Sequence, residues 1–174
     1  MWDFFTTVRN RHSIRKYQAD MPVEKEKLHA ILEMVCAAPS AGDLQPYHIF
    51  VVSNAEKRIA LSKAANDQEF VSEAPVCLVF CARPEVSNAR FGERGKSLYA
   101  LQDTTIAATY AQLASVAAGL SSTWVGYFEE QQIKEILELE DSYHPVALLC
   151  LGYPAEIPEA TTRVPMEQVI SYIE

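Results

Sequence analysis

"SLYALQDTTIAATYAQLASVAA", residues Ser97 to Ala118, is the stretch of this chain that most constrains its architecture. At 1.5 Å per residue it predicts a helix of about 33 Å, and Gly119 follows it at the position where helices commonly end. Alanine and threonine recur along it, so the helix is slim and neighbouring helices can approach it closely. We therefore expect it at the centre of the core or at a subunit interface.

Short apolar runs on both sides of this helix predict the strands of a sheet. They are rich in β-branched and aromatic residues and are bounded by turn-forming residues. A buried stripe at helical spacing, Leu28, Ile31, Leu32 and Val35, predicts a helix between two of the flanking segments. The expected strands are residues 47–52, 75–82, 122–128 and 144–153, and the expected helices are residues 23–38, 56–65, 97–118 and one through Ile133, Ile136 and Leu137.

Two segments do not follow this alternation of expected strands and helices. Residues 82–95 read as the only long irregular loop of the chain. The tail after Tyr153 contains three prolines before a last short helical stretch, and it ends in Val169, Ile170, Tyr172 and Ile173. These apolar side chains are unfavourable in water, so we expect the tail to wrap over another surface, such as a second subunit.

Composition limits the class of protein. A chain of 174 residues fits one domain, 1–174, and 49% hydrophobic with 22% charged residues is ordinary for a globular protein. A formal net charge of -8 argues against a general nucleic-acid binder. The first residues lack a signal-peptide pattern, and no apolar run is long enough for a spanning helix. We expect a cytoplasmic protein with no membrane partner.

Common catalytic and metal-binding signatures are missing from the sequence. It has no GxGxxG, GxxxxGK[ST], GxSxG or HExxH motif, and its four histidines lack helical pairing. The four cysteines, Cys36, Cys77, Cys81 and Cys150, lie in apolar contexts and are interpreted as small core residues, with a zinc ligand or a catalytic thiol as alternatives. We predict no metal site.

The segment "RNRHSIRKYQ", Arg9 to Gln18, holds four of the 15 cationic residues of an acidic chain. If residues 13–17 are extended, Arg11, Ser13 and Arg15 share one face over about 13 Å. Two guanidinium groups and a hydroxyl on one face suit a phosphomonoester at one end and an electron-rich group at the other. The alternative is a solvated basic loop, which is our interpretation of Arg9 and Lys16.

Two further segments suggest a flat ligand. In "AAPSAGDLQPYHIFVV", residues 37–52, small residues fill a turn between a helix and a strand and allow close approach of the backbone. In "GLSSTWVGYF", residues 119–128, Gly126 ends a strand and allows the same. The alternatives are an ordinary connecting loop and a β-bulge.

Taken in order, six segments resemble the nitroreductase family of FMN-dependent oxidoreductases, over residues 3–170. These segments are "RHSIRKY", "APSAGDLQPYHIFVV", "RFGERGKSLYALQD", "GLSSTWVGYF", "LGYPAE" and "TTRVPMEQVI". The resemblance implies an α+β nitroreductase-like fold, with a central, mostly antiparallel sheet flanked by helices. It also implies an intertwined homodimer with two FMN molecules at the interface, in which the tail, residues 153–174, embraces the partner subunit.

The resemblance also assigns residues to the cofactor. By analogy, Arg11, His12 and Ser13 hold the ribityl phosphate side with Arg163 from the tail, and Arg15 reaches the pyrimidine edge as electrostatic support. A loop lent by the other subunit and the backbone facing the reactive N5 region complete the site, and Gln68 is a further polar contact. The loop residues are Pro39, Ser40, Ala41 and Asp43, and the backbone residues are Val125 and Gly126.

The function implied is transfer of reducing equivalents from NADH or NADPH through FMN to a nitroaromatic, a quinone or another small conjugated acceptor, in two successive half-reactions. The flavin carries the chemistry, so no catalytic side chain is predicted. Arg90, Phe91 and Arg94 of the 82–95 loop would then cover the flavin, unless the loop is an ordinary surface excursion. Reductive dehalogenation, flavin fragmentation and a non-enzymatic flavin-binding module are the alternatives.

One position departs from the family pattern. The loop usually reads PS-x-x-N-x-Q-P, and this chain has Asp43 at the asparagine position. An amide both donates and accepts hydrogen bonds, whereas an ionised carboxylate only accepts them. We therefore expect Asp43 to lower the reduction potential of a bound flavin relative to asparagine.

Overall fold

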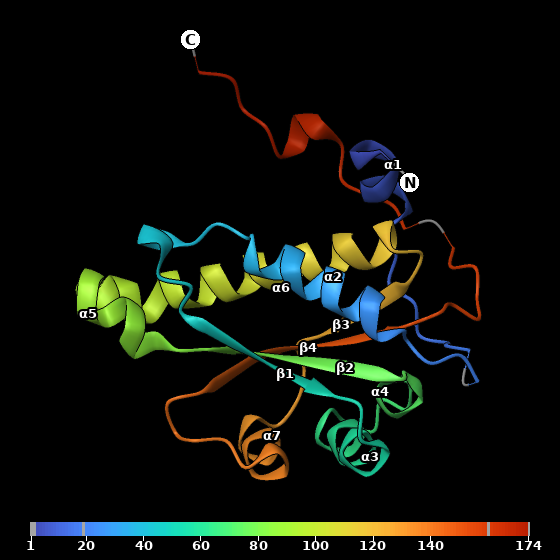
Figure 1. Cartoon of the computed structure of the whole chain (residues 1–174). Coiled ribbons are helices and arrows are strands. Elements are labelled where there is room, and N and C mark those ends of the chain that lie inside the picture. Colours follow the sequence, from blue (N-terminus) through green and yellow to red (C-terminus); the bar gives the residue numbers. More distant parts are fainter. Residues whose placement is uncertain (1–2, 19, 160, 174) are drawn as a thin grey trace.

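The computed structural model describes residues 3–18, 20–159 and 161–173. Its centre is a four-stranded sheet in the order β1-β2-β4-β3, and every neighbouring pair is antiparallel (Figure 1). The strands are β1, Tyr47–Val52; β2, Val76–Ala82; β3, Ser121–Val125; and β4, His144–Gly152. Three strands lie within one residue of the predicted ranges, whereas β3 ends at Val125, three residues before the predicted end at residue 128.

Helices cover both faces of the sheet. In Figure 1, α2, Lys25–Cys36, and α6, Ala100–Ala117, lie on one face, while α3, Ala55–Ala64, α4, Phe70–Glu73, and α7, Glu130–Leu137, lie on the other. The remaining elements are α1, Phe4–Asn10; α5, Pro84–Arg94; the 3-10 turns η1, Ala41–Asp43, and η3, Met166–Gln168; and the π-helical turn η2, Gly95–Tyr99. An antiparallel sheet flanked by helices confirms the predicted fold class.

Alternation along the strands divides the core into two clusters, one on each side of the sheet. Leu78 and Phe80 point to the cluster that contains the buried side chains of α2 and α6. Cys77, Cys81 and Cys150 belong to the other cluster, with Leu61 of α3 among others. These three thiols are fully buried, as predicted, because both faces of β2 and β4 are covered.

Helix α6 lies against the sheet and α2 through its small side chains. Ala107, Ala108 and Ala111 have no exposed surface and belong to the same cluster as Ile31 and Val35 of α2. The helix ends as predicted, with Gly119 at φ 78°. Its start differs from the prediction, because the π-helical turn η2 precedes Ala100 and the α-helix itself begins there.

Two sequence predictions are wrong. Residues 82–95 are not an irregular loop, because α5 occupies Pro84–Arg94 and kinks at Gly92. Proline is favoured in the first turn of a helix, so Pro84 begins this element rather than breaking it. Cys36 is exposed, because it follows the buried Val35 by one residue and therefore faces about 100° away from the buried stripe of α2.

The tail leaves the body of the molecule after residue 156. Residues 161–173 are all exposed, and in Figure 1 they extend past α1. Ile157 and Ile173 expose 98% and 96% of their surface. Among the residues that the structure describes, no helix combines the length and the apolar character needed to cross a membrane.

Candidate functional site

The basic segment lies in an extended conformation beside β3. Ser13 pairs with Ser122 in parallel, the Ile14 amide donates to the Ser122 carbonyl at 3.2 Å, and the Thr123 hydroxyl donates to the Ile14 carbonyl. Ile14 is buried and anchors the segment in the core. The chain direction then places Arg15 near the level of Trp124, close to the end of β3.

The segment that follows β4 pairs with the other side of this stretch. The Gln18 amide donates to the Tyr153 carbonyl at 2.9 Å, and the Ala155 amide donates to the Lys16 carbonyl at 2.8 Å. Glu156 Oε1 accepts a 2.6 Å hydrogen bond from the Arg15 amide. Residues far apart in sequence are therefore fixed against each other around Arg15.

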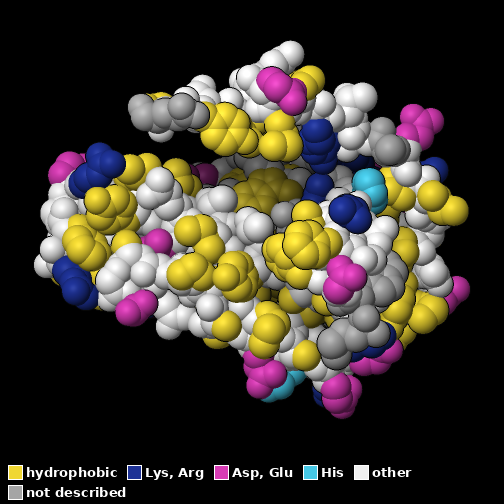
Figure 2. All heavy atoms as spheres, turned by 90° about the horizontal axis from the view of Figure 1, so that it is seen from above, with side chains coloured by type: hydrophobic (Ala, Val, Ile, Leu, Met, Phe, Trp, Pro, Cys, Tyr) yellow, Lys and Arg dark blue, Asp and Glu magenta, His cyan; other side chains and the backbone are white. Residues whose placement is uncertain are grey.

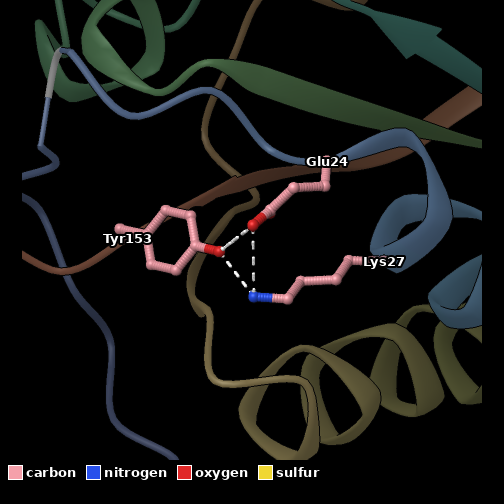
Figure 3. Close-up of polar contacts among 3 residues, drawn as sticks. All are labelled: Glu24, Lys27 and Tyr153. Atoms are coloured by element: carbon pink, nitrogen blue, oxygen red, sulfur yellow. Dashed lines mark hydrogen bonds and ion pairs between the residues drawn. The ribbon is translucent and has the colours of Figure 1, made fainter.

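Tyr153 is held by two side chains of the α2 region (Figure 3). Its hydroxyl accepts from Lys27 Nζ at 2.5 Å and lies 2.7 Å from Glu24 Oε1. These hydrogen bonds raise the pKa of Lys27 and lower the pKa of Glu24, because each one favours the charged form. The cluster ties the start of α2 to the segment that carries Glu156.

A hollow of about 420 Å³ opens between the basic segment and the start of the tail. This volume is in the range of small-molecule sites. Five predicted cofactor residues line it, namely Arg11, His12, Ser13, Arg15 and Arg163, together with Glu156, Pro158, Glu159 and Thr161. Lys16 does not line the hollow, in keeping with its interpretation as a solvated residue.

Charges of both signs surround this hollow. Three guanidinium groups face two carboxylates, but one Glu156 oxygen is engaged by the Arg15 amide. The Arg163 guanidinium donates to Thr161 Oγ1 at 2.7 Å. The donors without such a partner in the hollow are above all Arg11 and Ser13. They suit a multiply charged oxyanion.

Gln68 and Gly126 lie together at the far end of β3. Gln68 Nε2 donates to the Ala65 carbonyl at 2.7 Å and approaches the Tyr127 carbonyl at 3.4 Å. Gly126 is exposed, and a Cβ atom there would lie 3.2 Å from Trp124 Nε1. Arg15 connects this region to the hollow, because its guanidinium carbon lies 5.9 Å from the centre of the Phe70 ring.

The loop of Pro39, Ser40, Ala41 and Asp43 is not brought to this group within one chain. The Ala41 amide donates to Asp103, in the first turns of α6, whereas the basic segment pairs with β3, which begins just after α6 ends. The 18 residues of α6 span about 27 Å. The Pro39–Asp43 loop therefore lies near the start of α6, whereas the basic segment meets β3 just after the end of α6.

Sequence reasoning missed four residues of the hollow: Glu156, Pro158, Glu159 and Thr161. The motif "LGYPAE" ends in Glu156, but the motif alone does not show that its chain pairs with residues 15–18. In the described ranges 3–18, 20–159 and 161–173, no group of three His, Cys, Asp or Glu residues lies where it could hold a metal ion.

A family model described as "Nitroreductase family" matches residues 8–73 and 62–153. The chain belongs to the nitroreductase family. An NADH dehydrogenase of Thermus thermophilus is 33% identical, over 97% of this chain and 95% of its own length. An FMN reductase [NAD(P)H] of Bacillus subtilis is 29% identical, over 97% of this chain and 73% of its own length.

Solved structures of this family share the fold. The NADPH:FMN oxidoreductase from Vibrio harveyi, determined in complex with NAD+, superposes with a TM-score of 0.89 at 28% identity. The match covers 98% of this chain and 77% of that one. The nitroreductase fold predicted from the sequence is thereby confirmed.

Proposed function

We propose that this protein binds FMN and transfers reducing equivalents from NADH or NADPH to a nitroaromatic, a quinone or another small conjugated acceptor. The two substrates would use the same ring face in turn, in a ping-pong order. The observation that carries the proposal is the hollow in which Arg11, His12, Ser13, Arg15 and Arg163 converge from two distant parts of the chain. NADH and NADPH are supplied inside the cell, so a cytoplasmic location belongs to the same proposal.

The donor set of the hollow fits the phosphate of FMN. A phosphate monoester is a dianion near neutral pH and prefers guanidinium, imidazolium and hydroxyl donors. Arg11, His12 and Ser13 would hold it from the basic segment, and Arg163 would close on it from the tail. Glu156, whose carboxylate accepts from the Arg15 amide, would keep that segment in place.

The far end of β3 fits the ring system. Arg15 would face the pyrimidine edge and stabilise negative charge that develops there, as preorganised donors do in oxyanion holes. Val125 and Gly126 would present backbone to the reactive edge, and the missing side chain at Gly126 leaves room for it. Gln68 would add a polar contact through its side-chain oxygen, because its nitrogen already donates to the backbone.

FMN, when bound, supplies the hydride chemistry. The chain itself binds and orients the cofactor and excludes water from one side of it. Arg90, Phe91 and Arg94 all belong to α5, and Arg90 contacts the Pro39–Asp43 loop. These side chains would therefore border the acceptor site beside that loop and influence the choice of acceptor.

A second copy of the chain would complete the site. The loop at one end of α6 would reach the hollow at the other end of the partner's α6. The tail and α1 carry the surface for this homodimer, with Phe4 and Phe5 exposing 67% and 70% of their surface. A groove of about 480 Å³ beside them is lined by Phe4, Thr7, Met34, Tyr110, Leu113, Ala114 and Ala117.

The side of the molecule that carries α1, α2 and α6 has the character of such an interface. Figure 2 looks onto this side and shows hydrophobic side chains spread across it, below the tail. Exposed hydrophobic side chains gathered on one face are typical of protein–protein contacts. The single domain, 1–174, would therefore work as half of a dimer, with its tail on the partner.

The proposal is tested by the colour and the chemistry of the purified protein. We expect a yellow protein that releases FMN on denaturation and whose bound flavin is bleached by NADH or NADPH without oxygen. A flavin that binds but is not reduced by either donor would favour the non-enzymatic binding module. A colourless protein that takes up no added FMN would contradict the proposal.

A further inference from the structure

The loop from Pro39 to Gln45 has a conformation that its own residues disfavour. Gly42 has φ 59°, and Asp43 and Gln45, which carry side chains, have φ 56° and 44°. This left-handed region is unfavourable for residues with a Cβ atom and persists only where the surroundings impose it. The loop therefore depends on contacts that hold it.

Some of these contacts come from the loop and from α2. Ser40 Oγ accepts a 2.9 Å hydrogen bond from the Gln45 amide. Gln45 Nε2 donates to the Cys36 carbonyl at 2.8 Å. The Asp43 amide also donates to the Ser40 carbonyl at 3.0 Å. These bonds hold the turn together and tie it to α2, but they do not tie its tip, Ala41–Asp43, to the other helices.

The tip is held by two charged side chains from other helices. Both carboxylate oxygens of Asp103, in α6, lie 3.1 Å from the Ala41 amide nitrogen and accept its hydrogen bond. Arg90 Nη1, in α5, donates to the Gly42 carbonyl at 2.9 Å. Gly42 permits this approach, because a Cβ atom there would lie 2.7 Å from Arg90 Nη1.

Asp103 is a carboxylate at a buried position, where a charged group is unfavourable. Only 4% of its surface is exposed, and burial raises the pKa of its carboxyl group while the Ala41 amide opposes the rise. Within the described residues, the Ala41 amide is its one hydrogen-bond donor. A buried carboxylate with a single donor costs free energy that an apolar side chain would not. The structural effect of this unfavourable burial is that the carboxylate holds Ala41 in place.

These anchors leave two groups of the loop available to a ligand. Ser40 accepts through its oxygen but keeps its hydroxyl proton, and the Asp43 carboxylate is exposed. We propose that Asp103, assisted by Arg90, is a positioning residue that holds the loop so that Ser40 and Asp43 face the flavin of the partner subunit. This inference rests on the proposed function, because it assumes an FMN site.

The first measurement needs no cofactor. In protein stripped of flavin, hydrogen exchange at the Ala41 amide should accelerate by about tenfold or more in Asp103→Ala, because its acceptor is gone. Asp103→Asn keeps one acceptor oxygen, so its exchange rate at the Ala41 amide should lie between those of the wild type and Asp103→Ala. Ser115→Ala is the control: it removes a buried hydroxyl of α6 that bonds only to Ala111 of its own helix. Unchanged exchange in Asp103→Ala would overturn the inference.

The second measurement is FMN binding by the same proteins. We expect Asp103→Ala to bind FMN about tenfold more weakly and to shift the absorption spectrum of the bound flavin, with Asp103→Asn closer to the wild type and Ser115→Ala unchanged. If Asp103→Ala bound FMN with wild-type affinity and spectrum despite faster exchange at the Ala41 amide, the inference would be wrong but the proposed function would stand. A wild-type protein that binds no FMN would overturn the proposed function and this inference with it.

Discussion

Arg11 and Lys16 carry the same charge in one short segment, but only Arg11 lines the hollow. A hydrogen bond to a charged group typically contributes about 1.5 to 3 kcal/mol. Arg11→Ala should therefore weaken FMN binding by roughly 10- to 150-fold, while Lys16→Ala should leave it nearly unchanged. Fluorescence titration with FMN measures both. Equal losses in the two variants would mean that only the general positive charge of the segment matters.

Asp43 is the position where this chain departs from the family pattern. It is exposed and has φ 56°, a value that asparagine also tolerates, so Asp43→Asn should preserve the backbone. A nearby carboxylate disfavours added electrons by about 1 kcal/mol, so the variant should raise the flavin potential by about 20 mV. A redox titration against dyes of known potential measures this. An equal or lower potential in the variant would show that Asp43 does not act on the flavin.

Single residues were predictable where a local pattern decides them. Alternation along the basic segment selected Arg11, Ser13 and Arg15 and set Lys16 aside, in agreement with the lining of the hollow. Glu156 and Asp103 were missed, because their roles depend on chain pairing and helix packing that no local pattern contains. Cys36 was misassigned, because an apolar sequence context does not report which face of a helix a residue occupies.

The secondary structure elements were predictable to the extent that their hydrophobic period is strong. The four strands and helices α2 and α7 follow such patterns. Helix α6 was predicted instead from its alanine-rich length and the following Gly119, and α3 was expected between two strands. Helix α5 was missed, because Pro84 and Gly92 resemble loop residues and few of its side chains are buried. Its stability comes from docking, since Ser87 is buried and Phe91 lies against Tyr99, with ring centres 5.4 Å apart.

The docking of α5 on the following turn depends on Gly95. A Cβ atom at this buried position would collide with the Ser87 carbonyl and would lie 2.8 Å from Phe91 Cβ. Overpacking of this kind costs about 1 to 3 kcal/mol, so Gly95→Ala should lower the Tm by about 2 to 12 °C. Glu93→Ala, a substitution at an exposed position of α5, is the control for thermal unfolding. An unchanged Tm in Gly95→Ala would mean that α5 moves freely on the turn.

The two ends of α6 separate the residues that one flavin would need. Asp103 fixes the loop near the start of α6, and the basic segment pairs with β3 after the helix ends at Ala117, about 21 Å from Asp103 along the axis. No rotation of side chains closes such a distance. The proposed site would therefore need a second copy in which the two ends exchange. The family resemblance implies such an exchange, whereas sequence periodicity shows neither the exchange nor the distance.

Mixed dimers test this exchange directly. Arg11→Ala damages the hollow, and Ser40→Trp places a bulky side chain in the loop; each homodimer should bind FMN weakly at both of its sites. In a heterodimer of the two, purified through different tags, one site would combine an intact hollow with an intact loop. We expect one FMN per heterodimer at wild-type affinity, measured by titration and by flavin release.

The alternative arrangement gives a different result in the same experiment. If each hollow were completed by the loop of its own chain, both sites of the heterodimer would carry one defect, and neither would bind FMN tightly. A heterodimer of wild-type chains with the two tags controls for effects of the tags and of the purification. The stoichiometry of tight binding thus decides which chain contributes the loop, because the two arrangements differ only in how the same defects are distributed.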